Sequence, residues 1–154
     1  KIVESVASDL FIVEEKTDMY NNLGYLYFTT GQYDKSEKMY MSAMDVCYNP
    51  YLENPNKYIF HIFRVQINTS SLYLAMQNYE NAIRYGKDAL VNCEILYSVY
   101  PDFVVNEYPL TLQNMAQAAI ALGNKEYAAE LLAKALEIKP DDALTKELED
   151  SLKQ

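Results

Sequence analysis

The chain has 154 residues, of which 22 are acidic and 13 basic, so its formal net charge at pH 7 is −9. This balance argues against a nucleic acid or an anionic membrane as partner, because both need a basic surface, and it favours a basic or neutral polypeptide. No apolar run approaches the roughly 20 residues that would span a bilayer. The start has neither the cationic and apolar segments of a signal peptide nor an initiator Met, so we expect a segment excised from a longer chain.

Apolar residues recur at helical spacing along almost the whole chain. In chain order, we expect three pairs of helices. The first helix of a pair is lengthened, at about 9–30 and 56–77, and the second helix of each pair lies at about 33–48, 79–98 and 125–138. Two local signals predict where the lengthened helices start. Ser8-Asp9 can cap the first of them with a side chain, and Asn54-Pro55 places a proline in the first turn of the second. In the third pair, Pro109 would kink or break a first helix that began at residue 102.

The last predicted helix, at 141–152, has a different character from the others. Leu144, Leu148 and Leu152 form one apolar stripe, and charged residues occupy the rest of its surface. A helix of this kind can cover the exposed end of a stack of helices. We therefore expect it to act as a C-terminal cap.

Three asparagines, Asn22, Asn68 and Asn114, are spaced evenly along the chain (68 − 22 = 46 and 114 − 68 = 46). Aligning the chain on this period brings small residues together in three columns, as expected where paired helices approach closely. The columns are Gly24, Ser70 and Ala116; Ser36, Ala82 and Ala128; and Ala43, Ala89 and Ala135. The turns between helices align as Gly31-Gln32, Gln77-Asn78 and Gly123-Asn124, where a left-handed residue is expected to end each first helix.

The first copy carries a recognisable motif, an aromatic residue followed by Leu-Gly, Tyr and then Gly-x-Tyr. Its residues are Tyr20, Leu23, Gly24, Tyr27, Gly31 and Tyr33. This pattern resembles the tetratricopeptide repeat, with cores at 17–50, 63–96 and 109–142. The resemblance implies one all-α domain over 1–154, a right-handed α-solenoid of three helical hairpins with lengthened first helices and a capping helix.

The 46-residue period and the stretch Tyr20-Asn21-Asn22-Leu23-Gly24 are similar to the long repeats of kinesin light chains and spindle-orientation adaptors. In those families, Asn side chains on the first helices bind the backbone of an extended peptide in a concave groove. The resemblance therefore implies that role for Asn22, Asn68 and Asn114.

The chemistry of the side chains supports the same site. A primary amide offers both a donor and an acceptor, so it can pair with a peptide group whatever side chain the peptide carries. Residues three or four apart share one helix face. The predicted peptide-binding residues are Asn22, Asn68, Asn114, Asn21, Tyr25, Arg64, Ile67, Ser71, Gln113 and Gln117. In the alternative interpretation, these asparagines only hydrogen-bond between neighbouring helices.

Nothing in the sequence indicates catalysis. Cys47 and Cys93 are also 46 residues apart, which predicts buried thiols too distant for a disulfide and is consistent with a reducing, cytoplasmic location. His61, the only histidine, has no Ser, Cys or carboxylate spaced to form a nucleophile–base pair. We expect no metal, no cofactor and no enzymatic activity.

We therefore expect a non-catalytic module that binds an extended peptide. Arg64 is the only clear cation among the predicted groove residues, which disfavours the two-carboxylate clamp of chaperone-binding members of the family. Two alternatives stay open: the ligand-sensing half of a larger receptor or transcription factor, and an architectural module that associates with another copy of itself.

Overall fold

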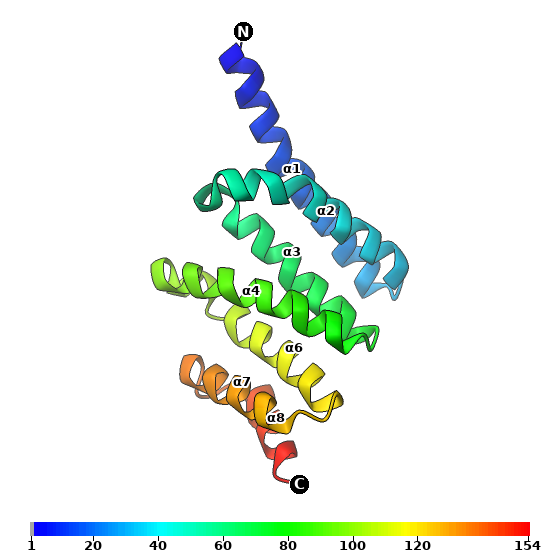
Figure 1. Ribbon diagram of the computed structural model, residues 1–154, viewed down its shortest axis with the longest axis vertical. Helices are drawn as coiled ribbons and strands as arrows, with labels where there is room; N and C mark the ends of the chain where they lie inside the picture. Colours follow the sequence, from blue (N-terminus) through cyan, green and yellow to red (C-terminus); the bar gives the residue numbers. More distant parts are fainter. Residues whose placement is uncertain (1) are drawn as a thin grey trace. The chain divides into compact units, whose positions relative to one another are not determined.

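The computed structural model describes the backbone of residues 2–154 and the side chains of residues 12–154. Over this range it contains eight helices and no strand, which confirms the predicted all-α class (Figure 1). The helices are α1 (Ile2–Thr29), α2 (Tyr33–Glu53), α3 (Pro55–Ala75), α4 (Tyr79–Val99), α5 (Pro101–Val104), α6 (Glu107–Ala121), α7 (Lys125–Ile138) and α8 (Ala143–Leu152). They form two compact units, Lys1–Asn68 and Thr69–Gln154. The single domain predicted over 1–154 stays a prediction.

Two helix boundaries differ from the prediction by more than two residues. α1 begins at Ile2 instead of residue 9, and the predicted capping side chains of Ser8 and Asp9 lie outside the described residues. α2 continues past residue 48 to Glu53 and includes Pro50. Its hydrogen bonding carries on through this last turn, since the Asn54 amide donates to the Pro50 carbonyl at 2.9 Å. α3 begins at Pro55, as predicted.

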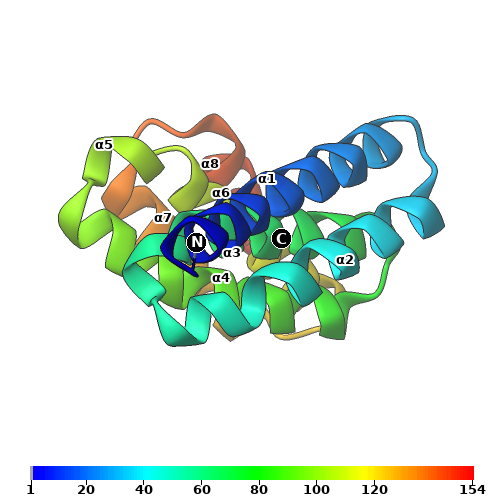
Figure 2. The same ribbon diagram turned by 90° about the horizontal axis from the view of Figure 1, so that it is seen from above.

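The first helix of the third repeat is broken, as Pro109 predicts. A single turn, α5, follows α4, and α6 starts anew at Glu107 (Figure 2). Pro109 is therefore the third residue of α6, where a backbone N–H would have no intrahelical partner. Its missing donor costs nothing at this position, because the first turn of a helix tolerates proline.

The three predicted turns share one hydrogen-bonding pattern. Gly31, Gln77 and Gly123 have φ values of 73°, 59° and 79°, the left-handed conformation that the sequence predicts. In the first turn, the Gly31 amide donates to the Phe28 carbonyl at 3.0 Å and the Gln32 amide to the Tyr27 carbonyl at 2.8 Å. The other two turns repeat both bonds. These Schellman turns confirm the 46-residue register.

Within the first unit, α1 and α2 touch where the sequence is small. Ser36 Oγ donates a hydrogen bond to the Gly24 carbonyl at 2.7 Å, and a Cβ on Gly24 would collide with the ring of Tyr40. Further along, Cys47 packs with Tyr58 and Ile62 of α3. The two helices can approach this closely only because position 24 has no side chain.

Within the second unit, the same two columns are joined by a hydrogen bond of reversed polarity. Here Ser70, on the first helix, donates to the carbonyl of Ala82, on the second, at 2.8 Å. Tyr73, Ala82 and Ala118 form a buried cluster beside this contact, and the ring of Tyr73 stacks on that of Tyr85 at 5.5 Å. The predicted small columns are therefore the contacts between paired helices.

The predicted leucine stripe of the capping helix α8 is partly covered, because Leu148 and Leu152 are half-buried whereas Leu144 is 42% exposed. The buried residue of α8 is Thr145. Gln113 of α6 donates to Asp142 Oδ2 at 2.6 Å and to Thr145 Oγ1 at 2.8 Å, so a polar network ties α8 to α6.

Overpacking the small columns should destabilise the fold. Ala82 and Ala128 are fully buried, so Ala82→Leu and Ala128→Leu should each lower the free energy of unfolding by about 1–3 kcal/mol in urea titrations. Ala121→Leu, at an exposed position of α6, is the matched control and should change stability little. Unchanged stability in both core variants would show that the register is wrong.

Gln77 is the one non-glycine residue with positive φ in the described part of the chain. Gln77→Gly should raise the free energy of unfolding by about 0.5–1 kcal/mol, because glycine adopts this conformation without strain. Gln77→Ala, which also removes the side chain but keeps the strain, should give no such gain. Equal stabilities of the two variants would contradict the interpretation.

The capping network should make stability depend on pH. The backbone N–H of Thr145 donates to Asp142 and holds the pKa of that carboxyl below its usual value. A depressed folded-state pKa contributes stability above the unfolded-state pKa, about 4, and that contribution is lost as the pH falls through the folded-state pKa. Asp142→Asn should therefore cost stability at pH 6 but not at pH 2 in urea titrations. A cost independent of pH would contradict this.

Candidate functional site

In the first unit, two amides of the predicted site hydrogen-bond each other. Asn68 Nδ2, on α3, donates to Asn21 Oδ1, on α1, at 3.0 Å. Asn21 is 2% exposed, whereas Asn68 is half-buried. This bond joins the first helices of successive repeats and fixes the orientation of the Asn68 side chain.

Next to this pair, α1 presents a polar and aromatic surface to solvent. Asn22 is exposed, and Tyr25, which is 56% exposed, lies about one turn further along the helix. Both residues belong to the predicted site. They keep their side chains available to a ligand because neither is buried beneath another helix.

The cation of the predicted site is partly neutralised. Arg64 Nη1 lies 3.6 Å from Asp18 Oδ1, and the same oxygen is 2.9 Å from His61 Nδ1. The residues around His61 in the sequence do not predict this carboxylate partner, because Asp18 is 43 positions away. The 46-residue period could have revealed it, since the period places residue 18 opposite residue 64, one turn from His61.

In the second unit, Asn114 is also engaged between first helices. Its Nδ2 donates to Ser71 Oγ of α3 at 2.7 Å, and the residue is 4% exposed. Gln117, one turn further along α6, is half-buried. Gln113 is 4% exposed and points to the capping helix, where it bonds Asp142 and Thr145.

The ten predicted residues therefore do not form one exposed face. The residues left exposed or half-buried are Asn22, Tyr25, Arg64, Asn68, Ser71 and Gln117. The residues that the structure buries are Asn21, Ile67, Gln113 and Asn114. The expectation of a shared exposed face is wrong for these four. The physical reason for the three amides is that each bonds a neighbouring helix.

The described side chains, 12–154, contain no group of three or more His, Cys, Asp or Glu residues that could hold a metal ion. Cys47 and Cys93 are buried free thiols, as predicted. Burial raises the pKa of Cys47 to about 11 and that of Cys93 to about 12, so both stay protonated near neutral pH. Among the described residues, no helix is long and apolar enough to cross a membrane.

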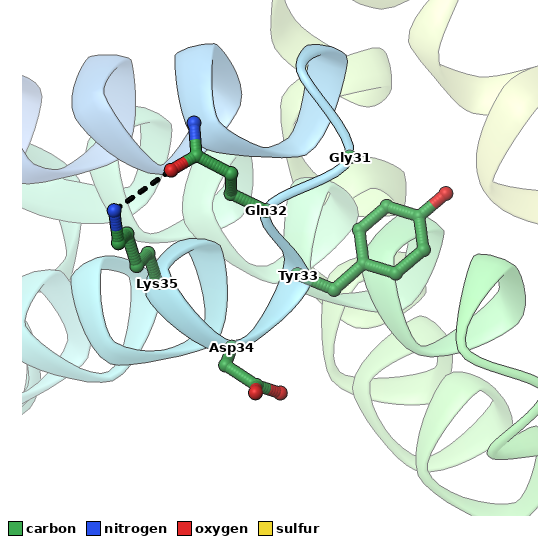
Figure 3. A pocket seen from close by; sticks show the side chains of 5 residues that line it. All are labelled: Gly31, Gln32, Tyr33, Asp34 and Lys35. Atoms are coloured by element: carbon green, nitrogen blue, oxygen red, sulfur yellow. Dashed lines mark hydrogen bonds between the residues drawn. The ribbon is translucent and has the colours of Figure 1, made fainter.

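A surface hollow lies at the turn between α1 and α2, lined by the consecutive residues 31–35 (Figure 3). Lys35 Nζ donates to Gln32 Oε1 at 2.8 Å beside it. None of the ten predicted site residues lines this hollow. One turn supplies all of its lining, so it contains no convergence of functional groups from different helices.

Comparisons with known proteins agree with this architecture. The tetratricopeptide repeat model matches residues 17–49 and 111–142, close to the first and third predicted cores, and does not match the second. No curated protein matches the sequence significantly.

Solved structures resemble the chain over most of its length. The tetratricopeptide repeat domain of Arabidopsis OM64 has a TM-score of 0.72 at 15% identity, covering 92% of this chain and 97% of that one. The first such domain of Spaghetti (RPAP3), bound to the HSP90 peptide SRMEEVD, has a TM-score of 0.63 at 20% identity, covering 92% and 93%. The first domain of human RPAP3 has 0.62 at 18%, covering 92% of each chain.

These identities are low, so the structural likeness establishes the fold. The family itself is indicated by the two matched segments, which contain the Schellman turns at Gly31 and Gly123 and the small columns that the structure buries. Residues 17–49 and 111–142 therefore match the tetratricopeptide repeat, and the chain has the fold of tetratricopeptide repeat domains.

Proposed function

We propose that the chain is a non-catalytic protein–protein interaction module that binds an extended peptide through the polar face of its first helices. Each unit carries candidate residues of its own, which we call a half-site and describe by itself. The first half-site is Asn22, Tyr25, Arg64 and Asn68, and the second is Ser71, Asn114 and Gln117. The observation that carries the proposal is the first half-site, where an exposed amide and an exposed tyrosine lie one turn apart beside an amide already oriented by its neighbour.

The amides suit the backbone of a peptide. A side-chain amide has two N–H donors and an oxygen with two lone pairs. In Asn68, one N–H is used by Asn21, which leaves a donor and the oxygen in a fixed orientation. An oriented amide loses little conformational entropy when it binds, so it contributes more to affinity than a mobile one. Tyr25 adds contact area at a low entropy cost.

The charges favour a neutral or basic peptide. Arg64 is the only cation of the two half-sites and lies 3.6 Å from the carboxylate of Asp18. A terminal carboxylate would compete with Asp18 for it and would face a chain of net charge −9. Although the RPAP3 domain of Spaghetti binds an acidic HSP90 peptide, we propose a different peptide class for this chain.

This difference can be measured with the peptide SRMEEVD, which carries two glutamates and an aspartate. We expect fluorescence anisotropy at 0.15 M salt to show no binding below about 1 mM, because the half-sites supply no second cation to hold the carboxylates. The charge-reversed peptide SDMKKVR is the matched probe and should bind more tightly. Tighter binding of the acidic peptide would contradict the proposed charge preference.

Burial distinguishes two of the asparagines, since Asn22 is exposed and Asn114 is 4% exposed. Asn22→Ala should leave stability unchanged or slightly improved, because Asn22 is exposed and Ala is the better helix former. It should weaken a peptide selected from a displayed library by about 1 kcal/mol or more. Asn114→Ala should instead lower the free energy of unfolding by about 1–2 kcal/mol, because it removes a buried side chain together with its hydrogen bond to Ser71.

Urea titration and isothermal calorimetry on the same samples test both expectations, with the exposed Thr29→Ala as control. Unchanged peptide affinity in Asn22→Ala and in Tyr25→Ala would refute the first half-site. The amides would then act only between helices, as in the alternative interpretation.

A further inference from the structure

One face of α1 exposes apolar side chains at positions that the later repeats bury. Ile12, Met19 and Leu26 are 37%, 48% and 55% exposed. They are seven residues apart, which is close to two helical turns, so they lie along one stripe of the helix. We call these three residues the α1 stripe. None of them belongs to either half-site.

The 46-residue period shows what this register does elsewhere in the chain. The equivalent residues are Tyr58, Val65 and Leu72 one period later, and Val104, Thr111 and Ala118 two periods later. Each of these six residues is at most 1% exposed. The register is therefore a packing surface in both later repeats, and only in α1 is it open to solvent.

The buried copies of the register share the same kind of cover. Within the first unit, Tyr58 of α3 packs against Cys47 of α2. Within the second unit, Ala118 of α6 belongs to the same buried cluster as Ala82 of α4. In each case the cover is the second helix of the preceding repeat. In the part of the chain that the structure describes, no such helix covers α1.

The α1 stripe also differs from the surface that ends a stack of repeats. A terminal repeat needs a polar outer face to stay soluble. The last helix has polar residues at its exposed positions, among them Glu147, Asp150 and Ser151. The α1 stripe is instead apolar and has charged neighbours, a combination that marks an interaction surface.

One charged residue of this face specifies the partner further. Lys16 is exposed between Ile12 and Met19 and occupies the register of Tyr108. Tyr108 Oη donates to Glu94 Oε1 of α4 at 3.3 Å. A helix that covered α1 as α4 covers α6 would therefore place a carboxylate at the register of Glu94 beside Lys16. Such a charge pair would fix the register of the partner helix.

We infer that the α1 stripe docks an amphipathic helix of a partner protein, whose apolar face resembles the face that α4 turns to α6 and carries an acidic residue opposite Lys16. A second copy of this chain does not supply that helix, because the corresponding faces of α2 and α4 are already buried, with Cys47 and Cys93 fully covered. The inference does not rest on the proposed binding of an extended peptide, since the ligand and the residues are different.

A helical peptide with the sequence of α4, residues 79–99, is the probe. A staple across positions 91 and 95 holds it helical, and both positions are exposed in the chain, 58% and 48%. We expect fluorescence anisotropy under reducing conditions to show saturable binding to the full chain, with a dissociation constant below about 1 mM.

The face is tested with two lysine variants of the full chain. Met19→Lys should weaken binding of the stapled peptide by about tenfold or more, because it would bury an unpaired charge under the helix. Ile95→Lys is the matched control, since Ile95 and Met19 are both 48% exposed, and it should leave binding unchanged. Circular dichroism checks that both variants fold.

A charge exchange tests the register. Lys16→Glu should weaken the stapled peptide by about threefold or more, because two carboxylates would then face each other. A peptide with Glu94→Lys should bind the Lys16→Glu chain better than it binds the wild-type chain. A loss without this recovery would overturn the proposed register of the partner helix.

Three other results would overturn the docking surface itself. The first is the absence of saturable binding of the stapled peptide below about 1 mM. The second is binding that Met19→Lys leaves unchanged or that Ile95→Lys weakens equally. The third is self-association of the wild-type chain in analytical ultracentrifugation that Met19→Lys abolishes, because it would show that a second copy covers the α1 stripe.

Discussion

The close approach of paired helices at small side chains is the constraint on which the rest of the structure depends. In the first unit, Ser36 of the second helix donates to the carbonyl of Gly24 of the first helix. In the second unit the serine lies on the first helix instead, where Ser70 donates to the carbonyl of Ala82 of the second. A larger residue at either column would separate the helices and overpack the core. The Schellman turns then fix the direction in which each second helix returns, with the left-handed residue placed every 46 positions.

Once the hairpins are fixed in this way, the asparagines on the first helices differ in their burial and in their hydrogen-bond partners. Asn114 and Asn21 are buried and hydrogen-bond the first helix of a neighbouring repeat. Asn22 has no such neighbour and stays exposed. The same residue type at one register can therefore join helices in one repeat and face solvent in another. The proposed peptide binding and the observed helix packing would therefore use different copies of one amide column.

The sequence predicted the fold closely, because periodic small residues, turn residues and apolar spacing are local signals. It predicted the candidate site less well. Whether Gln113 faces solvent or α8 depends on Asp142 and Thr145, nearly 30 residues away, and the spacing within α6 contains no information about them. The pairing of His61 with Asp18 was missed for the same reason. The period aligns equivalent positions, but burial of each copy depends on what packs against it.

If Asn22 and Asn68 bind the backbone of an extended peptide, as proposed, their side-chain amides must respond when a peptide is added. NMR can follow the amide resonances of these two residues during titration with a peptide selected from a displayed library. We expect both NH₂ groups to shift and to exchange more slowly with water at saturation, while those of Asn78 and Asn124, which cap α4 and α7, stay unchanged. Shifts confined to residues 31–35 or to α4, with Asn22 and Asn68 unaffected, would show that the peptide binds elsewhere.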